Sequence, residues 1–177
     1  MQIRDKIVLI TGASSGIGAA MAQAMSRVGA AQVLLLARSL PRLEKVAGEI
    51  KSRGGLARVY PVDLSDSAAI EVVTQRILAE VGVPDILINN AGSGRWKFLA
   101  ETSAAEIVQM MTLPYFAAAW LTRSLLPGML ARGSGHIVNI SSVASRLAWP
   151  GANPYIAPCR AMPGLSHPPR SHSYRTH

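Results

Sequence analysis

The chain has 177 residues, of which 49% are hydrophobic and only 16% are charged, so it is neither a disordered chain nor an acidic tail protein. The formal net charge is +8, but no basic stripe with interleaved aromatic residues accompanies it, so we expect no nucleic-acid partner. No apolar run is long enough to cross a membrane, and the single cysteine, Cys159, excludes a disulfide framework and a cysteine zinc site. We therefore expect one cytoplasmic domain without a membrane contact or a metal site.

Short apolar segments alternate with amphipathic segments from residue 6 to residue 140. The expected strands are residues 6–10, 32–36, 57–62, 85–89 and 135–140. The expected helices are residues 16–28, 41–53, 66–81 and 103–132. Alternation of this kind is typical of βαβ units, and the near-continuous apolar runs are typical of strands covered on both faces. The sequence predicts an α/β fold with a Rossmann-type, doubly wound parallel sheet that binds its ligand at the carboxyl ends of the strands.

Local signals mark two of the helix starts and one interruption. Asp66 is a suitable N-cap for the third helix, and Ser103 with Glu106 three residues later has the spacing of a capping box. Pro114 lies inside the fourth expected helix, where its ring and its missing N–H predict a kink.

The last segment of the chain differs in composition. Residues 156–177 contain four prolines and three of the chain's four histidines, and they show no helical or strand period. We predict a disordered tail there, because interior prolines such as Pro158 and Pro163 break helices. The folded domain would then comprise residues 1–155, and the sheet would be incomplete at its C-terminal end.

The first expected strand runs directly into a glycine-rich turn. Its glycines, Gly12, Gly16 and Gly18, have the spacing G-x-x-x-G-x-G. Glycine lets the chain turn sharply and lets a phosphate approach the backbone, and the helix that begins here directs free N–H groups at that phosphate. Between a strand and a helix, this motif predicts a dinucleotide-binding site.

With three further motifs, the glycine-rich turn makes the chain resemble the short-chain dehydrogenase/reductase family. The motifs are Asn89-Asn90-Ala91-Gly92 after the fourth strand, Asn139-Ile140-Ser141-Ser142 at the end of the fifth, and Tyr155 thirteen residues after Ser142. The resemblance covers residues 1–155. It implies an NAD(P)-dependent oxidoreductase that moves a hydride between nicotinamide and a small-molecule alcohol or carbonyl substrate.

The resemblance also implies roles for individual residues. Ser142 and Tyr155 match the catalytic pair, in which the serine hydrogen-bonds the substrate oxygen and the tyrosine exchanges that oxygen's proton. Asp63 matches the acid near the adenine ring. The expected cofactor-binding residues are Gly12, Ser14, Ser15, Gly16, Ile17, Gly18, Arg38, Asp63, Asn89, Asn90, Ala91 and Gly92.

The end of the second strand indicates which nicotinamide cofactor to expect. An NAD site calls for a carboxylate at this position, where it binds the ribose 2′-hydroxyl. The strand instead ends Leu36-Ala37-Arg38, and the guanidinium of Arg38 can pair with a 2′-phosphate. We therefore expect NADP rather than NAD, the alternative being that Arg38 is simply a solvated arginine at the start of a helix.

The sequence departs from the family pattern after Tyr155. The family motif is Y-x-x-x-K, and here Cys159 occupies the lysine position. A tyrosine with a pKa near 10 needs a neighbouring positive charge to act as a base at neutral pH, and a thiol does not supply one. We therefore expect weak or absent turnover, with a catalytically inactive dinucleotide-binding or partner-binding module as the alternative function. The family's chains are also longer and form homo-oligomers, so we expect a truncated chain whose oligomerisation is impaired.

Overall fold

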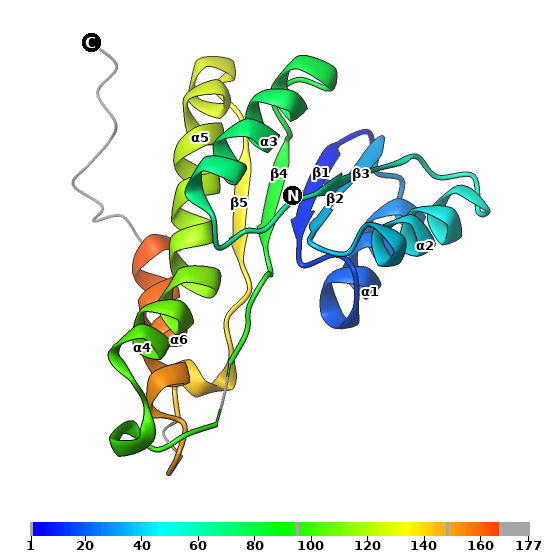
Figure 1. The fold of residues 1–177 in the computed structure, drawn as a ribbon. Coiled ribbons are helices and arrows are strands. Elements are labelled where there is room, and N and C mark those ends of the chain that lie inside the picture. The colour runs from blue at the N-terminus through cyan, green and yellow to red at the C-terminus, as the bar shows by residue number, and fades with distance from the viewer. Residues whose placement is uncertain (1, 95, 148, 167–177) are drawn as a thin grey trace.

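The computed structural model describes residues 2–94, 96–147 and 149–166. Within them, five parallel strands form one sheet in the order β3-β2-β1-β4-β5 (Figure 1). The strands are β1 (Ile7–Thr11), β2 (Gln32–Ala37), β3 (Ala57–Pro61), β4 (Ile86–Asn89) and β5 (His136–Asn139). The α-helices are α1 (Gly16–Arg27), α2 (Leu40–Lys51), α3 (Ser67–Glu80), α4 (Ala104–Met111), α5 (Ala117–Arg132) and α6 (Asn153–Ser166). The predicted α/β fold with a doubly wound parallel sheet is confirmed.

Alternate residues along the strands pack against helices on opposite faces of the sheet. Val8 and Ile10 of β1 face α1 and α2, whereas Leu9 between them faces α3 and α5. Figure 1 shows these two pairs of helices on the two sides of the sheet. Both faces of the central strands are therefore buried, which explains why the strand sequences are almost continuously apolar.

The chain order places a crevice between β1 and β4. From β1 the chain moves outward to β2 and β3, then returns to β4 on the other side of β1. Thr11, at the end of β1, joins the two strands because its hydroxyl accepts hydrogen bonds from Asn90 N and Ala91 N, both at 2.9 Å. Helices on opposite faces diverge at such a switch point, so it is the place where open α/β sheets bind ligands.

Both predicted helix caps are present in the structure. The Asp66 carboxylate accepts hydrogen bonds from the N–H groups of Ala68 and Ala69, and Ser103 and Glu106 form a reciprocal capping box. The helix expected over residues 103–132 is interrupted at Pro114, as predicted. The interruption takes the form of one π-helical turn, Thr112–Phe116, between α4 and α5. A wider turn suits proline, which has no N–H to donate to the carbonyl four residues earlier.

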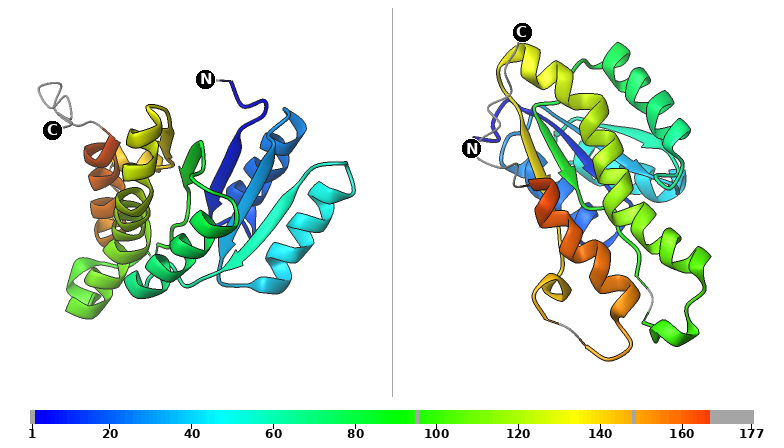
Figure 2. Two further views of the ribbon diagram at one scale, coloured as in Figure 1. Left: turned by 90° about the horizontal axis from the view of Figure 1, so that it is seen from above. Right: turned by 90° about the vertical axis from the view of Figure 1, so that its left-hand side faces the viewer.

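The predicted disordered tail is wrong for residues 156–166, because α6 runs from Asn153 to Ser166. Ile156, Cys159 and Met162 form a buried stripe along this helix, which packs against α4, the π-helical turn and β5 (Figure 2). Pro163 cannot donate to the Cys159 carbonyl, and the Ser141 hydroxyl donates to that carbonyl instead, at 3.0 Å. Tertiary contacts thus stabilise a helix that its prolines disfavour. The rest of the predicted tail, 167–177, lies outside the described residues.

Among the residues that the structure describes, no helix combines the length and the hydropathy required to span a bilayer.

Candidate functional site

The glycine-rich turn after β1 brings the start of α1 very close to the end of β1. Gly12 and Gly16 have φ angles of +67° and +54°, in the left-handed region that favours glycine. Gly18 is restricted by space. A Cβ added to it would lie 2.7 Å from Asn90 Nδ2 and 2.8 Å from the carbonyl carbon of Gly12. The turn therefore requires glycine at all three positions, for two different reasons.

The N-terminus of α1 is open toward the crevice. Its N-cap residue, Ser15, makes no side-chain capping hydrogen bond, and its first turn contains no acidic residue. The N–H groups of that turn consequently remain available to an anion, which the helix dipole also favours. These features fit the pyrophosphate of a dinucleotide.

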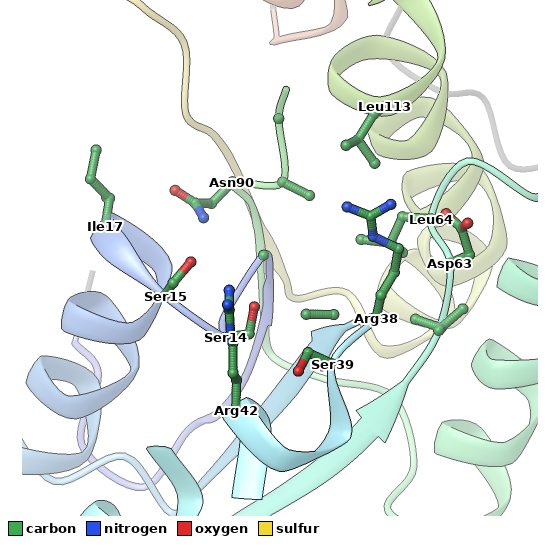
Figure 3. A pocket seen from close by; sticks show the side chains of 15 residues that line it. Ser14, Ser15, Ile17, Arg38, Ser39, Arg42, Asp63, Leu64, Asn90 and Leu113 are labelled. Atoms are coloured by element: carbon green, nitrogen blue, oxygen red, sulfur yellow. The ribbon is translucent and has the colours of Figure 1, made fainter. Parts of the chain in front are cut away.

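A first cavity of about 420 Å³ lies at the carboxyl ends of the strands (Figure 3). Most of the expected cofactor-binding residues line it: Gly12, Ser14, Ser15, Ile17, Arg38, Asp63, Asn90, Ala91 and Gly92. Gly16 and Gly18 shape the turn but lie outside the lining of this cavity. Asn89 is buried behind the cavity, where its side-chain amide donates to Asn139 Oδ1 at 2.8 Å.

Two arginines lie at one end of the first cavity. Arg38 follows β2, Arg42 lies four residues later in the first turn of α2, and Ser39 lies between them in the chain. Figure 3 shows both side chains directed toward the cavity. Sequence reasoning missed Arg42 and Ser39. The signal for Arg42 was its position in the first turn of the helix that follows Arg38, close to the carboxyl end of β2.

Asp63 is ionised, and hydrogen bonds from Ser65 in the same turn fix the position of its carboxylate. The hydroxyl and the N–H of Ser65 donate to its carboxylate at 2.7 and 2.9 Å, and these bonds hold the pKa of Asp63 below its ordinary value. The positive charge of Arg38 adds a smaller lowering of that pKa. The side chains of Val62 and Leu64, which sequence reasoning also missed, line the cavity on either side of Asp63 in the chain. This end of the cavity thus offers apolar surface next to a fixed carboxylate.

A second cavity of about 440 Å³ adjoins the first, since Ile17, Asn90, Ala91 and Gly92 line both. The structure brings the two expected catalytic residues, Ser142 and Tyr155, into this second cavity. Ser142 follows β5, and Tyr155 lies in the first turn of α6.

Neighbouring backbone fixes both of these side chains. The Ser142 hydroxyl accepts a hydrogen bond from Ala144 N at 3.2 Å, which leaves its own proton to be donated to a ligand. The ring of Tyr155 lies against Gly94, where an added Cβ would come within 2.6 Å of Tyr155 Cε2. A glycine at position 94 therefore leaves room for the tyrosine ring in the cavity wall.

Cys159 lies one helical turn after Tyr155 and lines the same cavity. Burial raises the pKa of the Cys159 thiol, while a hydrogen bond with Tyr155 opposes that rise. The thiol is therefore neutral at pH 7. None of the described residues that line the second cavity is Lys, Arg or His, so they place no positive charge beside the Tyr155 hydroxyl.

Comparison with known proteins agrees with this geometry. The sequence matches the family model for short chain dehydrogenases over residues 6–175. An uncharacterized oxidoreductase of Mycobacterium tuberculosis is 44% identical over 168 residues, which make up 92% of this chain and 49% of that protein. A fatty acyl-CoA reductase of Acinetobacter baylyi is 39% identical over 166 residues, which make up 93% of this chain and 56% of that protein. The chain thus spans about half the length of the curated relatives it matches.

Solved structures show the same arrangement of elements. A metagenomic short-chain oxidoreductase in complex with NADP superposes with a TM-score of 0.88 at 36% identity, over 93% of this chain and 75% of that chain. An alcohol dehydrogenase from Thermococcus sibiricus, complexed with 5-hydroxy-NADP, superposes with a TM-score of 0.83 at 32% identity, over 90% of this chain and 68% of that chain.

Proposed function

Because this chain belongs to the short-chain dehydrogenase family, we propose that it binds NADP and interconverts a small-molecule carbonyl compound and its alcohol. The observation that carries the proposal is the pair of adjoining cavities at the carboxyl ends of the strands. One contains the glycine-rich turn and two arginines, and the other contains Ser142 and Tyr155.

The first cavity would bind the adenosine half of the cofactor. The turn at Gly12 and the open N-terminus of α1 would hold the pyrophosphate through backbone N–H groups. Arg38 and Arg42 would hold the 2′-phosphate with charge-assisted hydrogen bonds, and no carboxylate lies at the end of β2 to select NAD instead. The two arginines favour NADP over NAD.

The second cavity would hold the reacting groups. When bound, NADP(H) supplies or accepts the hydride. For carbonyl reduction, Ser142 donates a hydrogen bond to the carbonyl oxygen and orients it. The Tyr155 hydroxyl gives its proton to that oxygen as the carbon gains the hydride. The product is the alcohol, and the phenolate of Tyr155 recovers a proton from solvent. For alcohol oxidation, Tyr155 would have to start as the phenolate.

Cys159 makes the reductive direction the easier one at neutral pH. With a pKa near 10, only about one phenol in a thousand is ionised at pH 7, and lowering that pKa by roughly three units takes about 4 kcal/mol. The neutral thiol of Cys159 supplies none of this stabilisation. A tyrosine without a neighbouring positive charge is better suited to give a proton than to take one. The same observation favours a second candidate function, a cofactor-binding module without turnover.

A variant at Cys159 separates these two functions. We expect Cys159→Lys to raise kcat for NADPH-dependent carbonyl reduction on the order of a hundredfold, the usual scale of an acid–base contribution, because a neighbouring ammonium stabilises the phenolate that forms as Tyr155 gives up its proton. The measurement is NADPH consumption with a panel of aldehydes and ketones. Cys159→Met is the matched control for a longer but uncharged side chain, and Tyr155→Phe in the Cys159→Lys background should abolish the gain.

Saturable NADPH binding without consumption by either the natural chain or Cys159→Lys would support the inactive module. A Cys159→Met variant as fast as Cys159→Lys would contradict the role given to the charge.

A further inference from the structure

The second cavity is polar at one end and otherwise uncharged. Its hydroxyl groups come from Ser93, Ser141, Ser142 and Tyr155. The Ser141 hydroxyl donates to the Cys159 carbonyl, whereas Ser142 and Tyr155 are the pair to which the proposed function assigns the ligand oxygen. None of the described lining residues is Asp, Glu, Lys, Arg or His. Among these described residues, a charged group would find no side chain of opposite charge to offset the hydration that it loses, which is costly.

Apolar side chains supply the rest of the wall. The lining includes Ile17, Trp96, Pro114, Ile140 and Met162. They come from five separate parts of the fold: the start of α1, the segment after β4, the π-helical turn, the segment after β5, and α6. A small polar substrate would satisfy Ser142 and Tyr155 but would leave this apolar wall in contact with water.

The apolar wall continues outward as an aromatic rim, formed by Trp96, Phe98 and Trp149. Trp96 lines the cavity and lies 6.2 Å from Trp149 between ring centroids. Lys97 N donates to Gly151 O at 2.6 Å, and the ring of Phe98 lies next to Gly151, so the two loops that carry the rim are joined. Trp96 is 67% exposed and Phe98 is 56% exposed, so both rings offer apolar surface to a ligand.

We propose that the substrate of this site is an uncharged carbonyl compound carried on a long aliphatic chain, together with its alcohol. The carbonyl oxygen contacts Ser142 and Tyr155, and the aliphatic chain leaves the cavity across the aromatic rim. This inference rests on the proposed function for the placement of the reacting oxygen. It adds the chemical class of the substrate and the surface that recognises it.

The test is calorimetric titration of the NADPH-loaded chain with butanol, octanol and dodecanol, each kept below its solubility limit. These alcohols report binding without turnover. We expect affinity to rise roughly three- to fourfold for each methylene that the rim covers. Dodecanoate, which has the same chain length and a negative charge, should bind on the order of tenfold more weakly than dodecanol.

The rim is tested by Trp96→Ala, with Trp96→Phe as the conservative variant and Val72→Ala as the matched control. Val72 is an exposed apolar residue of α3, and it lines neither cavity. Trp96→Ala should remove most of the gain in affinity from butanol to dodecanol. Trp96→Phe and Val72→Ala should keep the gain.

Affinity that does not change with chain length, equal binding of dodecanoate and dodecanol, or equal losses in Trp96→Ala and Val72→Ala would each overturn the inference. The last result would indicate nonspecific adsorption of the alcohols. If the chain does not bind NADPH at all, the proposed function itself is wrong. If NADPH binds and chain length has no effect, only the substrate class is wrong.

Discussion

At the residue scale, the absence of one carbon atom decides whether the glycine-rich turn can form. Gly18 lies so close to the Gly12 carbonyl and to Asn90 that any side chain would push α1 away from β1. Such a shift would move the first-turn N–H groups of α1 away from the position where they meet a phosphate. The close packing and the proposed binding site therefore depend on the same missing Cβ.

We expect Gly18→Ala to destabilise the fold by about 1–3 kcal/mol, the usual cost of forcing atoms into a packed site, and to weaken NADPH binding as well. Gly48→Ala is the matched control, because Gly48 lies inside α2 and an added Cβ there meets nothing within 4 Å. That variant should stabilise the fold by about 0.5–1 kcal/mol. Urea unfolding of the three chains measures both effects, and equal stabilities would contradict the packing described for Gly18.

The site residues that sequence reasoning missed have one feature in common. Arg42 is an exposed arginine in the first turn of α2, and only its position four residues after Arg38 distinguishes it from any solvated arginine. Val62 and Leu64 looked like ordinary apolar residues after a strand. Residues with a recognisable motif could be predicted, whereas residues that act through their position in space could not.

At the element scale, strands were easier to predict than helix ends. Each observed strand lies within one residue of its predicted range at either end, because buried parallel strands give continuous apolar runs. The helix α6 was missed because the spacing of Ile156, Cys159 and Met162 was not recognised as a helical period and the prolines favoured a tail. Ser141, which satisfies the Cys159 carbonyl, is 18 residues away in the sequence, and a contact of this kind is invisible to local reasoning.

Hydrogen bonds around Glu106 link the start of α4 to Lys97, in the loop that carries Trp96 and Phe98. The Glu106 carboxylate accepts hydrogen bonds from Ser103 N at 2.8 Å and from Lys97 Nζ at 3.0 Å. These bonds, the one from the Ser103 N–H first, lower the pKa of Glu106 to about 2 from an ordinary value of 4.5. The loop and the helix start therefore depend on an ionised Glu106.

Because of this network, the free energy of unfolding should depend on pH between 4.5 and about 2. The pKa of Glu106 is lower in the folded state, so its contribution to stability is full above pH 4.5 and is lost as the pH falls toward about 2. We expect the stability difference between the natural chain and Glu106→Gln to shrink over that range. Urea unfolding from pH 7 to pH 2.5 measures it, with Glu101→Gln in the neighbouring turn as the control. A difference that stays constant with pH would show that ionisation of Glu106 is not involved.

At the scale of the whole molecule, one edge of the sheet gathers everything the proposed chemistry needs. The switch point between β1 and β4 opens the crevice, and α1 directs its N-terminus into it. The segments after β2, β4 and β5, together with the start of α2, the π-helical turn and α6, supply the arginines, the apolar wall and the hydroxyl groups. The net charge of +8 does not identify the ligand, whereas the placement of Arg38 and Arg42 in the first cavity supports the proposal of NADP. The impaired homo-oligomerisation expected from the sequence stays a prediction.

The most direct measurement is a titration of the natural chain with NADPH and with NADH, followed by nicotinamide fluorescence. The account predicts saturable binding of NADPH with a Kd at least about tenfold below that for NADH, since charge-assisted pairs with a 2′-phosphate contribute more than about 1.4 kcal/mol. Arg42→Ala should reduce that preference without changing the Kd for NADH. Saturable binding of neither nucleotide, or tighter binding of NADH, would contradict the assignment of the first cavity to NADP.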